Sequence, residues 1–254
     1  MISIRQPSTS LGRPKVSVVI PAFNEERLLP ATLQAIREAS LGFGDWGWDH
    51  EWIVCDNNST DRTAEIAAAA GARVVFEPVN QIGRARNAGA RVATGDWILF
   101  VDADSRPTRE LFADAVAAAS RPGVIAIGST IRLDGGGLSA AIAAEGWNFV
   151  SRFGHLLAGS FIMVDRNAFE TVGGFSLEFY AGEELDLVRR LKAHGKPDCR
   201  RIVILHRHPL ETSARKVRLY GPMETLGFLL RAVLRPRSTL RNRDSCFLWY
   251  DARR

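Results

Sequence analysis

The alternation of short apolar runs with helical segments over residues 16–101 is the feature that most limits how this chain can fold. Four apolar runs predict buried strands: 16–20, 52–55, 74–76 and 97–101. Helices are expected between them: 25–39, a segment ending at Ala70, and 82–93. Strands and helices that alternate in this way form right-handed crossovers and a largely parallel sheet. The sequence therefore predicts an α/β fold whose strands end at one shared edge, where such sheets bind ligands.

The rest of the chain extends this pattern. Further strands are expected at 124–133, 161–164 and 202–205. Further helices are expected at 138–157, 166–172, 183–194 and 215–234. We expect a mobile leader over 1–14, one domain over 15–213 that contains a loop at 40–50, and a tail over 214–254.

The composition bears on where such a protein works. The 254-residue chain is 46% hydrophobic and 24% charged, as is usual for a soluble globular protein. Its three cysteines are widely spaced, so neither a disulfide framework nor a zinc site is indicated. No signal peptide and no long uncharged apolar run is visible. We therefore expect a cytoplasmic protein, which would be peripheral on the inner face of the cell membrane if it contacts one.

The positive charge is concentrated at the carboxyl end. Residues 214–254 contain ten Lys and Arg against three Asp and Glu, whereas the preceding part is slightly acidic. An evenly basic nucleic-acid-binding domain has a different distribution, so no nucleic-acid partner is expected. Large apolar residues and arginines share the tail and allow two interpretations. A basic amphipathic helix could lie on an anionic membrane, or it could pack on the domain with its arginines covering a face or binding acceptor phosphate.

The strand predicted at 97–101 runs directly into Asp102, Ala103 and Asp104. Two carboxylates so close repel each other unless a cation lies between them or one is protonated. Mg²⁺ and Mn²⁺ are often held by one or two carboxylates together with phosphate oxygens, which points to a metal that carries a diphosphate. Alternatively, Asp104 or Ser105 caps a helix that begins near Thr108. The tripeptide alone leaves both interpretations open.

Other polar clusters follow predicted strands or begin predicted helices. They are Pro21-Ala22-Phe23-Asn24-Glu25-Glu26, Asp56-Asn57-Asn58-Ser59-Thr60-Asp61, Gly83-Arg84-Ala85-Arg86-Asn87-Ala88-Gly89 and Glu183-Glu184. The first two follow strands and should therefore lie near the Asp102–Asp104 turn. Ser59 or Thr60 is expected to cap the helix that ends at Ala70.

Together these clusters resemble the nucleotide-diphosphate-sugar transferases of glycosyltransferase family 2, which have the GT-A fold. The opening Val-Ser-Val-Val-Ile-Pro-Ala-Phe-Asn-Glu-Glu over 16–26 matches the start of that family closely. The similarity continues in Val172-Gly173-Gly174-Phe175 and in Gly182-Glu183-Glu184 and the helix that follows, and it covers about residues 16–210. It implies inverting transfer of a sugar from a nucleotide-diphosphate donor to an acceptor hydroxyl, with Mn²⁺ or Mg²⁺ as cofactor.

The resemblance also implies partners. A UDP-sugar is the favoured donor, with GDP- and dTDP-sugars as alternatives, and the acceptor is an unidentified sugar or lipid-linked molecule. Cell-surface polysaccharide or glycolipid synthesis is a process that fits this chemistry. Donor-binding residues carried over from the family are Pro21, Ala22, Phe23, Asn24, Glu25, Asp56, Asn58, Gly83, Arg84, Arg86, Asn87, Asp102 and Ala103.

Some of these residues also have a purely structural interpretation. Asp56 has acceptor-only oxygens suited to the imide N–H of a nucleobase. Many relatives have Asp-Asp-Gly where this chain has Asp56-Asn57-Asn58, so the base is less well specified. Glu25 could simply be a charge in the first turn of a helix. Arg84 and Arg86 could bind a diphosphate or form a solvated basic face.

The resemblance places catalysis at Glu183 and Glu184, with Glu184 as the base where relatives more commonly have Asp. Without it, the pair would be ordinary helix N-terminal charge. Asp104 is the principal candidate metal ligand, with Asp102 beside it. A histidine could complete such a site, and His206 is preferred to His208 because it directly follows the strand expected at 202–205.

Two other classes of protein use similar parts. A nucleotidyltransferase also combines an α/β sheet, a metal and paired acids, but typically has a Gly-rich basic loop directly after its first strand. This chain has Pro-Ala-Phe-Asn-Glu-Glu there instead. A non-catalytic nucleotide-sugar-binding protein could keep the fold, although both acidic pairs are retained in this chain.

Overall fold

A computed structural model describes residues 12–135, 137–215, 219, 227, 231, 235–246 and 250 of the chain. Most of the expected leader and most of the helix predicted at 215–234 therefore lie outside the described residues. None of the helices in the described part is long and apolar enough to cross a membrane.

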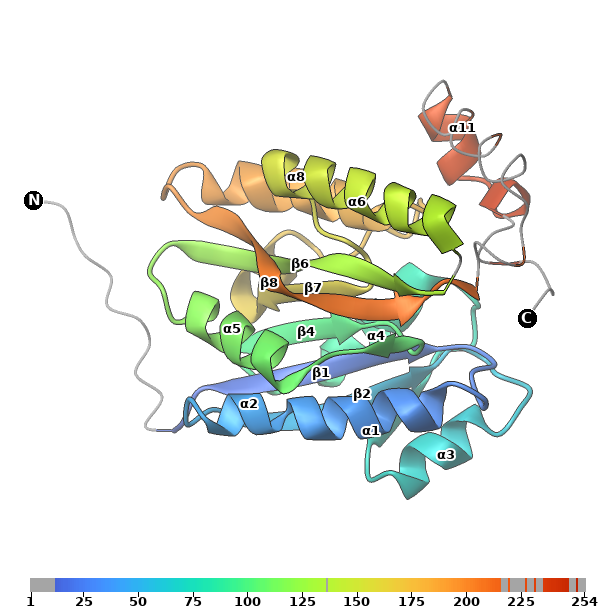
Figure 1. Cartoon of the computed structure of the whole chain (residues 1–254), viewed down its shortest axis with the longest axis horizontal. Helices are drawn as coiled ribbons and strands as arrows, with labels where there is room; N and C mark the ends of the chain where they lie inside the picture. The colour runs from blue at the N-terminus through green and yellow to red at the C-terminus, as the bar shows by residue number, and fades with distance from the viewer. Residues whose placement is uncertain are drawn as a thin grey trace, which may run out of the picture.

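One eight-stranded sheet runs through the molecule in the order β3-β2-β1-β4-β7-β6-β8-β5 (Figure 1). Its strands are β1 (Lys15–Ala22), β2 (Asp49–Asp56), β3 (Arg73–Phe76), β4 (Trp97–Val101), β5 (Ser105–Arg106), β6 (Val124–Asp134), β7 (Phe161–Asp165) and β8 (Arg201–Ser213). The neighbours from β3 to β4 are parallel, as are β6 and β8. β7 is antiparallel to both of its neighbours, and β5 is antiparallel to β8. The predicted parallel sheet with helical crossovers is thus confirmed for the first four long strands.

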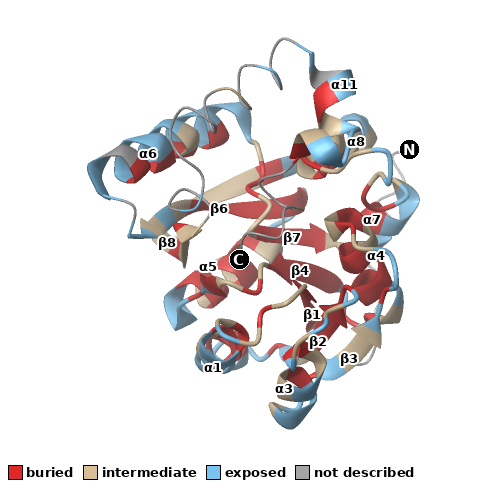
Figure 2. Ribbon diagram, turned by 90° about the vertical axis from the view of Figure 1, so that its right-hand side faces the viewer, coloured by how far each residue is buried: buried red, intermediate tan, exposed pale blue. Residues whose placement is uncertain are grey.

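Helices cover both faces of this sheet (Figure 2). They are α1 (Leu29–Ala39), α2 (Leu41–Gly44), α3 (Thr63–Ala69), α4 (Ile82–Val92), α5 (Arg109–Ala119), α6 (Gly137–Gly154), α7 (Arg166–Thr171), α8 (Glu183–Gly195) and α11 (Pro236–Leu240), with a 3₁₀ turn at Asp244–Cys246. Apolar residues of α1, α2, α3 and α5 form one core with the sheet, and those of α4, α7 and α8 form another.

Alternation of side chains along β1 shows how the sheet divides these cores. Val16, Val18 and Ile20 contribute to the core beneath α1 and α5, whereas Val19 contributes to the core beneath α4 and α8. All four are fully buried. A strand that is covered on both faces is apolar at most positions, which explains the run over 16–20. Its one polar residue, Ser17, is buried and donates a hydrogen bond from its hydroxyl to Glu51.

Several expected boundaries were wrong, each for a local reason. Residues 25–28 form a turn, and α1 begins only at Leu29 with Pro30 in its first turn. Neither Ser59 nor Thr60 caps α3, because Asp61 instead accepts hydrogen bonds from the backbone N–H and hydroxyl of Thr63. The strand expected at 202–205 continues to Ser213, through an irregular segment in which Ser129 pairs with Leu205 but Ile131 pairs with Leu210.

Gly89 lets the backbone of α4 lie directly against the side chain of Val19 on β1. A Cβ atom placed on Gly89 would overlap Cγ1 of Val19, a stiff β-branched side chain that is itself fully buried. The absence of a side chain at this position lets α4, and with it the 83–89 motif, lie close to the sheet.

We expect Gly89→Ala to lower the free energy of unfolding by about 1–3 kcal/mol, because overpacking against Val19 outweighs the gain in helix propensity. Gly146→Ala is the matched control, since a Cβ there meets no atom within 4 Å. It should be neutral or stabilising by up to about 1 kcal/mol. Urea unfolding of both variants measures the difference, and equal stabilities would contradict the close packing.

Candidate functional site

The turn from Asp102 to Asp104 connects β4 to β5 and is held on three sides. The hydroxyl of Thr32 donates to the carbonyl of Ala103 at 2.8 Å. The backbone N–H of Ser105 donates to the carbonyl of Asp102 at 3.1 Å, and that of Ser213 donates to the carbonyl of Asp104 at 3.2 Å. Contacts from α1 and β8 therefore fix both carboxylates at the end of β4.

The capping interpretation of this turn is wrong. α5 begins at Arg109, and its cap is Thr108, whose hydroxyl accepts a hydrogen bond from the N–H of Leu111 at 3.2 Å. Ser105 is in β5, where its hydroxyl donates to that of Thr212. Neither Asp104 nor Ser105 is used to begin the helix, so the two carboxylates need another explanation.

Two cavities meet at this turn. The first, the strand-end cleft, opens between the ends of β1, β2 and β4. Its lining residues are Pro21, Ala22, Phe23, Glu25, Asn57, Asn80, Ile82, Asp102, Ala103, Asp104, Arg215 and Tyr250. The second, the α6–α8 cavity, is lined partly by Arg86, Trp147, Gly159, Glu183 and Glu184. Ile82, Asp102 and Asp104 border both cavities.

Arg86 lies fully buried between Asp102 and the start of α8. Its Nη1 is 2.6 Å from Glu183 Oε1, and its Nη2 is 3.0 Å from Asp102 Oδ1 and 2.8 Å from the carbonyl of Gly159. Burial by itself would lower the pKa of Arg86, but the charges of Asp102 and Glu183 raise it overall. Arg86 therefore joins the end of β4 to α8 as a permanent cation.

Glu183 and Glu184 are neighbours in sequence but have different surroundings. Glu183 is buried and paired with Arg86. Glu184 is half-buried at the wall of the α6–α8 cavity, where its burial and the nearby charge of Glu183 raise its pKa to about 8. A Cβ on Gly159 would lie 3.2 Å from Nη2 of Arg86, so glycine there leaves room for the buried guanidinium beside Glu184.

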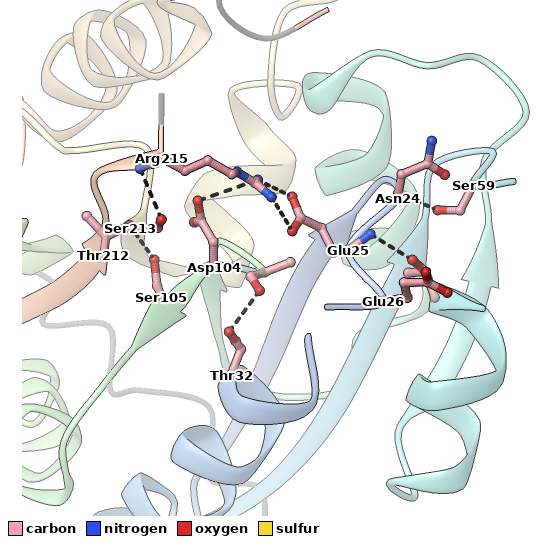
Figure 3. A network of polar contacts seen from close by, with 12 residues as sticks. Asn24, Glu25, Glu26, Thr32, Ser59, Asp104, Ser105, Thr212, Ser213 and Arg215 are labelled. Atoms are coloured by element: carbon pink, nitrogen blue, oxygen red, sulfur yellow. Dashed lines mark hydrogen bonds and ion pairs between the residues drawn. The ribbon is translucent and has the colours of Figure 1, made fainter. Parts of the chain in front are cut away.

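Arg215, just after β8, extends towards Glu25 and towards Asp104 of the turn (Figure 3). Its guanidinium donates two hydrogen bonds to Glu25, at 2.6 and 3.1 Å, and Nη2 is 3.9 Å from Asp104 Oδ2. Each aspartate of the turn thus has its own arginine nearby, Arg86 for Asp102 and Arg215 for Asp104. This arrangement relieves the repulsion between the carboxylates that the sequence implied.

The predicted donor-binding residues Asp56 and Asn58 lie at the end of β2 and in the loop that follows, and Asn24 lies just after β1. Asp56 is buried and accepts a hydrogen bond from the N–H of Ser59 at 3.0 Å. Asn24 accepts one from the N–H of Thr60 at 2.8 Å, and Asn58 has a positive φ of 67°. Asn57, which we did not predict, lines the strand-end cleft and is held by bonds with Val79 and Gln81.

The remaining residues of the 83–89 motif hold the fold rather than line the strand-end cleft. The amide of Asn87 donates to the carbonyl and accepts from the N–H of Phe175. Gly83 packs on Phe175 and Ser176, and Arg84 bonds to Gln81. A solvated basic face, the alternative for Arg84 and Arg86, is wrong for the fully buried Arg86.

The structure separates His206 from the acids. His206 and His208 do not follow a strand, because both lie within β8. Asp104 contacts Ser213, seven positions further along, and His206 is exposed. His208 instead faces α5, where its Nδ1 is 3.0 Å from Asp114. We therefore do not retain His206 as a metal ligand.

Asp102 and Asp104 nevertheless form a donor set that suits a hard divalent cation. Among the described residues no group of three or more His, Cys, Asp or Glu side chains is arranged to hold a metal ion. Mg²⁺-type sites often use one or two protein carboxylates and take further oxygens from a phosphate-bearing substrate. The turn fits that kind of shared site, with Asp104 better placed because Arg86 already binds Asp102.

Comparison with known families agrees with this geometry. The family model for glycosyl transferase family 2 matches residues 17–173, which is more than half of the chain. The chain belongs to glycosyltransferase family 2. Within the family, an uncharacterized glycosyltransferase of Mycobacterium tuberculosis is 44% identical over 89 residues, 35% of this chain and 36% of that protein. A 4,4'-diaponeurosporenoate glycosyltransferase of Staphylococcus haemolyticus is 35% identical over 108 residues, 40% of this chain and 27% of that protein.

The chain thus spans about a third of the length of these curated relatives. Solved structures cover more of it. A mannosyltransferase from Pyrobaculum calidifontis in complex with GDP-Man and Mn²⁺ has a TM-score of 0.65 at 21% identity, over 87% of this chain and 61% of that one. Glucosyl-3-phosphoglycerate synthase from Mycobacterium tuberculosis has a TM-score of 0.61 at 26% identity, over 88% and 78%. The expected GT-A fold is confirmed.

Arg86→Met should lower the free energy of unfolding by about 3–5 kcal/mol, because it leaves Glu183 buried without a countercharge. Arg84→Met is the matched control, because it makes the same substitution on the same helix but removes only a bond to Gln81. It should lower the free energy of unfolding by less than about 1 kcal/mol. Urea midpoints at unchanged slope measure both effects. Similar losses in the two variants would show that the buried network contributes little.

Proposed function

We propose that this family 2 protein is an inverting glycosyltransferase that moves a sugar from a nucleotide-diphosphate donor to an acceptor hydroxyl. The observation that carries the proposal is the meeting of two cavities at Asp102 and Asp104. One cavity is bordered by the strand-end loops expected to hold a nucleotide, and the other contains a carboxyl with a raised pKa. A sugar attached to a diphosphate at the turn would then lie between the nucleotide and the carboxyl of Glu184.

The strand-end cleft is the proposed donor site. Its floor is formed by the Pro21–Phe23 segment and Asn57, close to the buried Asp56. Arg215 enters the cleft as a cation that is only partly buried, so it can bind a diphosphate by charge-assisted hydrogen bonds. In that role it would exchange its contact with Glu25 for the phosphate oxygens.

Asp104, with Asp102 beside it, would hold Mn²⁺ or Mg²⁺ together with the diphosphate. The bound ion would supply positive charge that stabilises the departing diphosphate. Arg86 keeps Asp102 in place from the protein side, and the backbone contacts of the turn fix Asp104. The fit of the donor set and the Mn²⁺ in related structures support this assignment.

Glu184 is the proposed general base. Its position in the α6–α8 cavity lets it accept the proton of an acceptor hydroxyl while the hydroxyl oxygen bonds to the anomeric carbon. The bond from that carbon to the diphosphate breaks on the opposite side, so a single displacement inverts the sugar centre. Glu183 is paired with Arg86 and acts as support.

The neighbours indicate a range of donors. The Pyrobaculum enzyme was solved with GDP-Man, and the mycobacterial synthase with UDP-glucose. A UDP-sugar remains the favoured donor for this chain, with GDP- and dTDP-sugars as alternatives. Release of nucleoside diphosphate in the presence of Mn²⁺ would support the transferase, whereas release of pyrophosphate would support a nucleotidyltransferase.

A thermal-shift screen of UDP-, GDP- and dTDP-sugars tests the donor site. One of these donors should raise the unfolding temperature, and Mn²⁺ should increase the shift, because binding to the folded state alone stabilises it. Asp104→Asn should abolish the Mn²⁺-dependent part of the shift. Asp114→Asn is the control, since Asp114 lies on α5, where it contacts His208 of β8, and it lines neither cavity. If no nucleotide sugar stabilises the protein, the donor assignment fails.

Glu184→Gln should reduce transfer by at least about a hundredfold while leaving the donor-induced thermal shift unchanged, because it removes the base but not the donor site. In the unmodified enzyme kcat/KM should fall as the pH is lowered through about 8, since protonated Glu184 cannot accept a proton. Glu170→Gln serves as a matched control on α7. Retained turnover in Glu184→Gln would mean that another group is the base.

A further inference from the structure

Two residues of the carboxyl-terminal tail, far apart in sequence, line the strand-end cleft. Arg215 follows β8 directly, and Tyr250 lies near the end of the chain. The match to the family model ends at residue 173, and every donor-binding residue that the resemblance implied lies before Asp104. Tyr250 is therefore part of the wall of the cleft whose role neither the family nor the proposed reaction explains.

Contacts with the loop before α8 place this end of the tail. The carbonyl of Leu240, the last residue of α11, accepts a hydrogen bond from the N–H of Tyr180 at 2.8 Å. Cys246 packs with Ala181 in a small apolar cluster against which Tyr250 also lies. Figure 2 shows α11 next to α8, in agreement with these contacts. The described residues from 235 onwards thus pack on the domain and bring Tyr250 to the cleft.

The side chain of Tyr250 is held in place by three neighbours. Its hydroxyl oxygen accepts a hydrogen bond from the N–H of Ile82, the first residue of α4, at 3.3 Å. Its ring meets that of Tyr180 edge to face, with centroids 5.5 Å apart, and the guanidinium of Arg243 lies over it at 5.6 Å. The residue is only half-buried, so part of it stays accessible from the cleft. Because the hydroxyl oxygen is bonded to α4, a ligand in the cleft would contact mainly the ring.

The position of this ring is informative. Ile82, to which Tyr250 bonds, borders both the strand-end cleft and the α6–α8 cavity, so the ring lies near the place where the two cavities meet. A nucleotide-diphosphate sugar has a ring on each side of its diphosphate. Aromatic side chains bind such rings by stacking and by apolar contact.

We propose that Tyr250 is a donor-binding residue whose ring packs against a ring of the nucleotide sugar. The inference rests on the proposed donor site and gives the carboxyl-terminal tail a part in it. The bond to the N–H of Ile82 has a separate role, because it orients the ring and satisfies one of the free N–H groups at the start of α4.

Isothermal titration calorimetry of the full chain with UDP-glucose, GDP-mannose and dTDP-glucose, each with Mn²⁺, tests this role. Two variants separate the ring from the hydroxyl. Tyr250→Leu removes the ring, whereas Tyr250→Phe keeps it and removes only the acceptor of the Ile82 N–H. Phe179→Leu is the matched control, because Phe179 contacts Arg241 of the same tail but lines neither cavity.

For a nucleotide sugar that binds wild type, Tyr250→Leu should raise the dissociation constant at least about tenfold, because the donor loses an aromatic contact. Tyr250→Phe and Phe179→Leu should stay within about threefold of wild type. The unfolding temperature without ligand is measured for each variant, which separates a loss of donor affinity from a loss of stability.

A measurement on the unmodified protein covers the case in which Tyr250→Leu does not fold. A nucleotide sugar with Mn²⁺ should slow the nitration of Tyr250 by tetranitromethane, followed by peptide mass mapping. Tyr180 is the internal reference, since it lines neither cavity.

Three results would overturn the proposal while leaving the donor site intact. Tyr250→Leu could bind the nucleotide sugar as tightly as wild type, or the bound donor could leave the nitration of Tyr250 unchanged. Tyr250→Phe could weaken binding as much as Tyr250→Leu, which would assign the effect to the bond with Ile82. If no nucleotide sugar binds wild type, the proposed function fails and this inference fails with it.

Discussion

The buried cation at Arg86 is the interaction on which the arrangement of the site depends. A guanidinium taken out of water is costly unless carboxylates surround it, and here Asp102 and Glu183 do so from opposite ends of the site. The three residues come from α4, from the end of β4 and from the start of α8. Removing Arg86 would leave both carboxylates without their cation, so this side chain ties the Asp102–Asp104 turn to the start of α8.

This network also accounts for the different properties of two adjacent glutamates. Glu183 uses its charge to neutralise Arg86, and Glu184 has no such pairing among the described contacts and has a pKa raised to about 8 by its burial. A raised pKa at one of two neighbouring acids gives that group a chemistry that the other does not have. A carboxyl that is neutral over much of the physiological range but easily deprotonated is suited to take a proton from an alcohol.

The central parts of β1, β2 and β4 were predictable because they are covered on both faces and are therefore mostly apolar. Asp102 and Asp104 were predictable as a unit because the β4 run ends directly before them. The length of β8 was not, since its irregular segment places polar and exposed residues such as His206 inside a strand. Because we expected the strand to end at residue 205, we placed His206 and His208 in a loop after it, whereas both lie within β8.

Other parts of the site depend on contacts between distant segments, which composition and spacing do not encode. Arg215 lies 190 positions from Glu25, and Tyr250 reaches the N–H of Ile82 from the far end of the chain. The excess of arginine in the tail left open a membrane surface, a covered face of the domain and an acceptor phosphate, and it did not identify Glu25 as a contact of Arg215. The family resemblance placed Asn87 at the donor, whereas its side-chain amide donates to the carbonyl and accepts from the N–H of Phe175.

The two arginines differ in how freely they can respond to a ligand. The Arg86 side chain is 2% exposed and is paired with Asp102 and Glu183. If it left Asp102, part of its charge would be buried without a partner, which is costly. The Arg215 side chain is 23% exposed and is 3.9 Å from Asp104, a distance too long for a hydrogen bond. The ion pair between Asp104 and Arg215 is therefore longer and more exposed than the one between Asp102 and Arg86. This asymmetry supports the proposal that Asp104 is the principal metal ligand. Arg215 would have to exchange its two hydrogen bonds with Glu25 for the negative charge that a diphosphate brings.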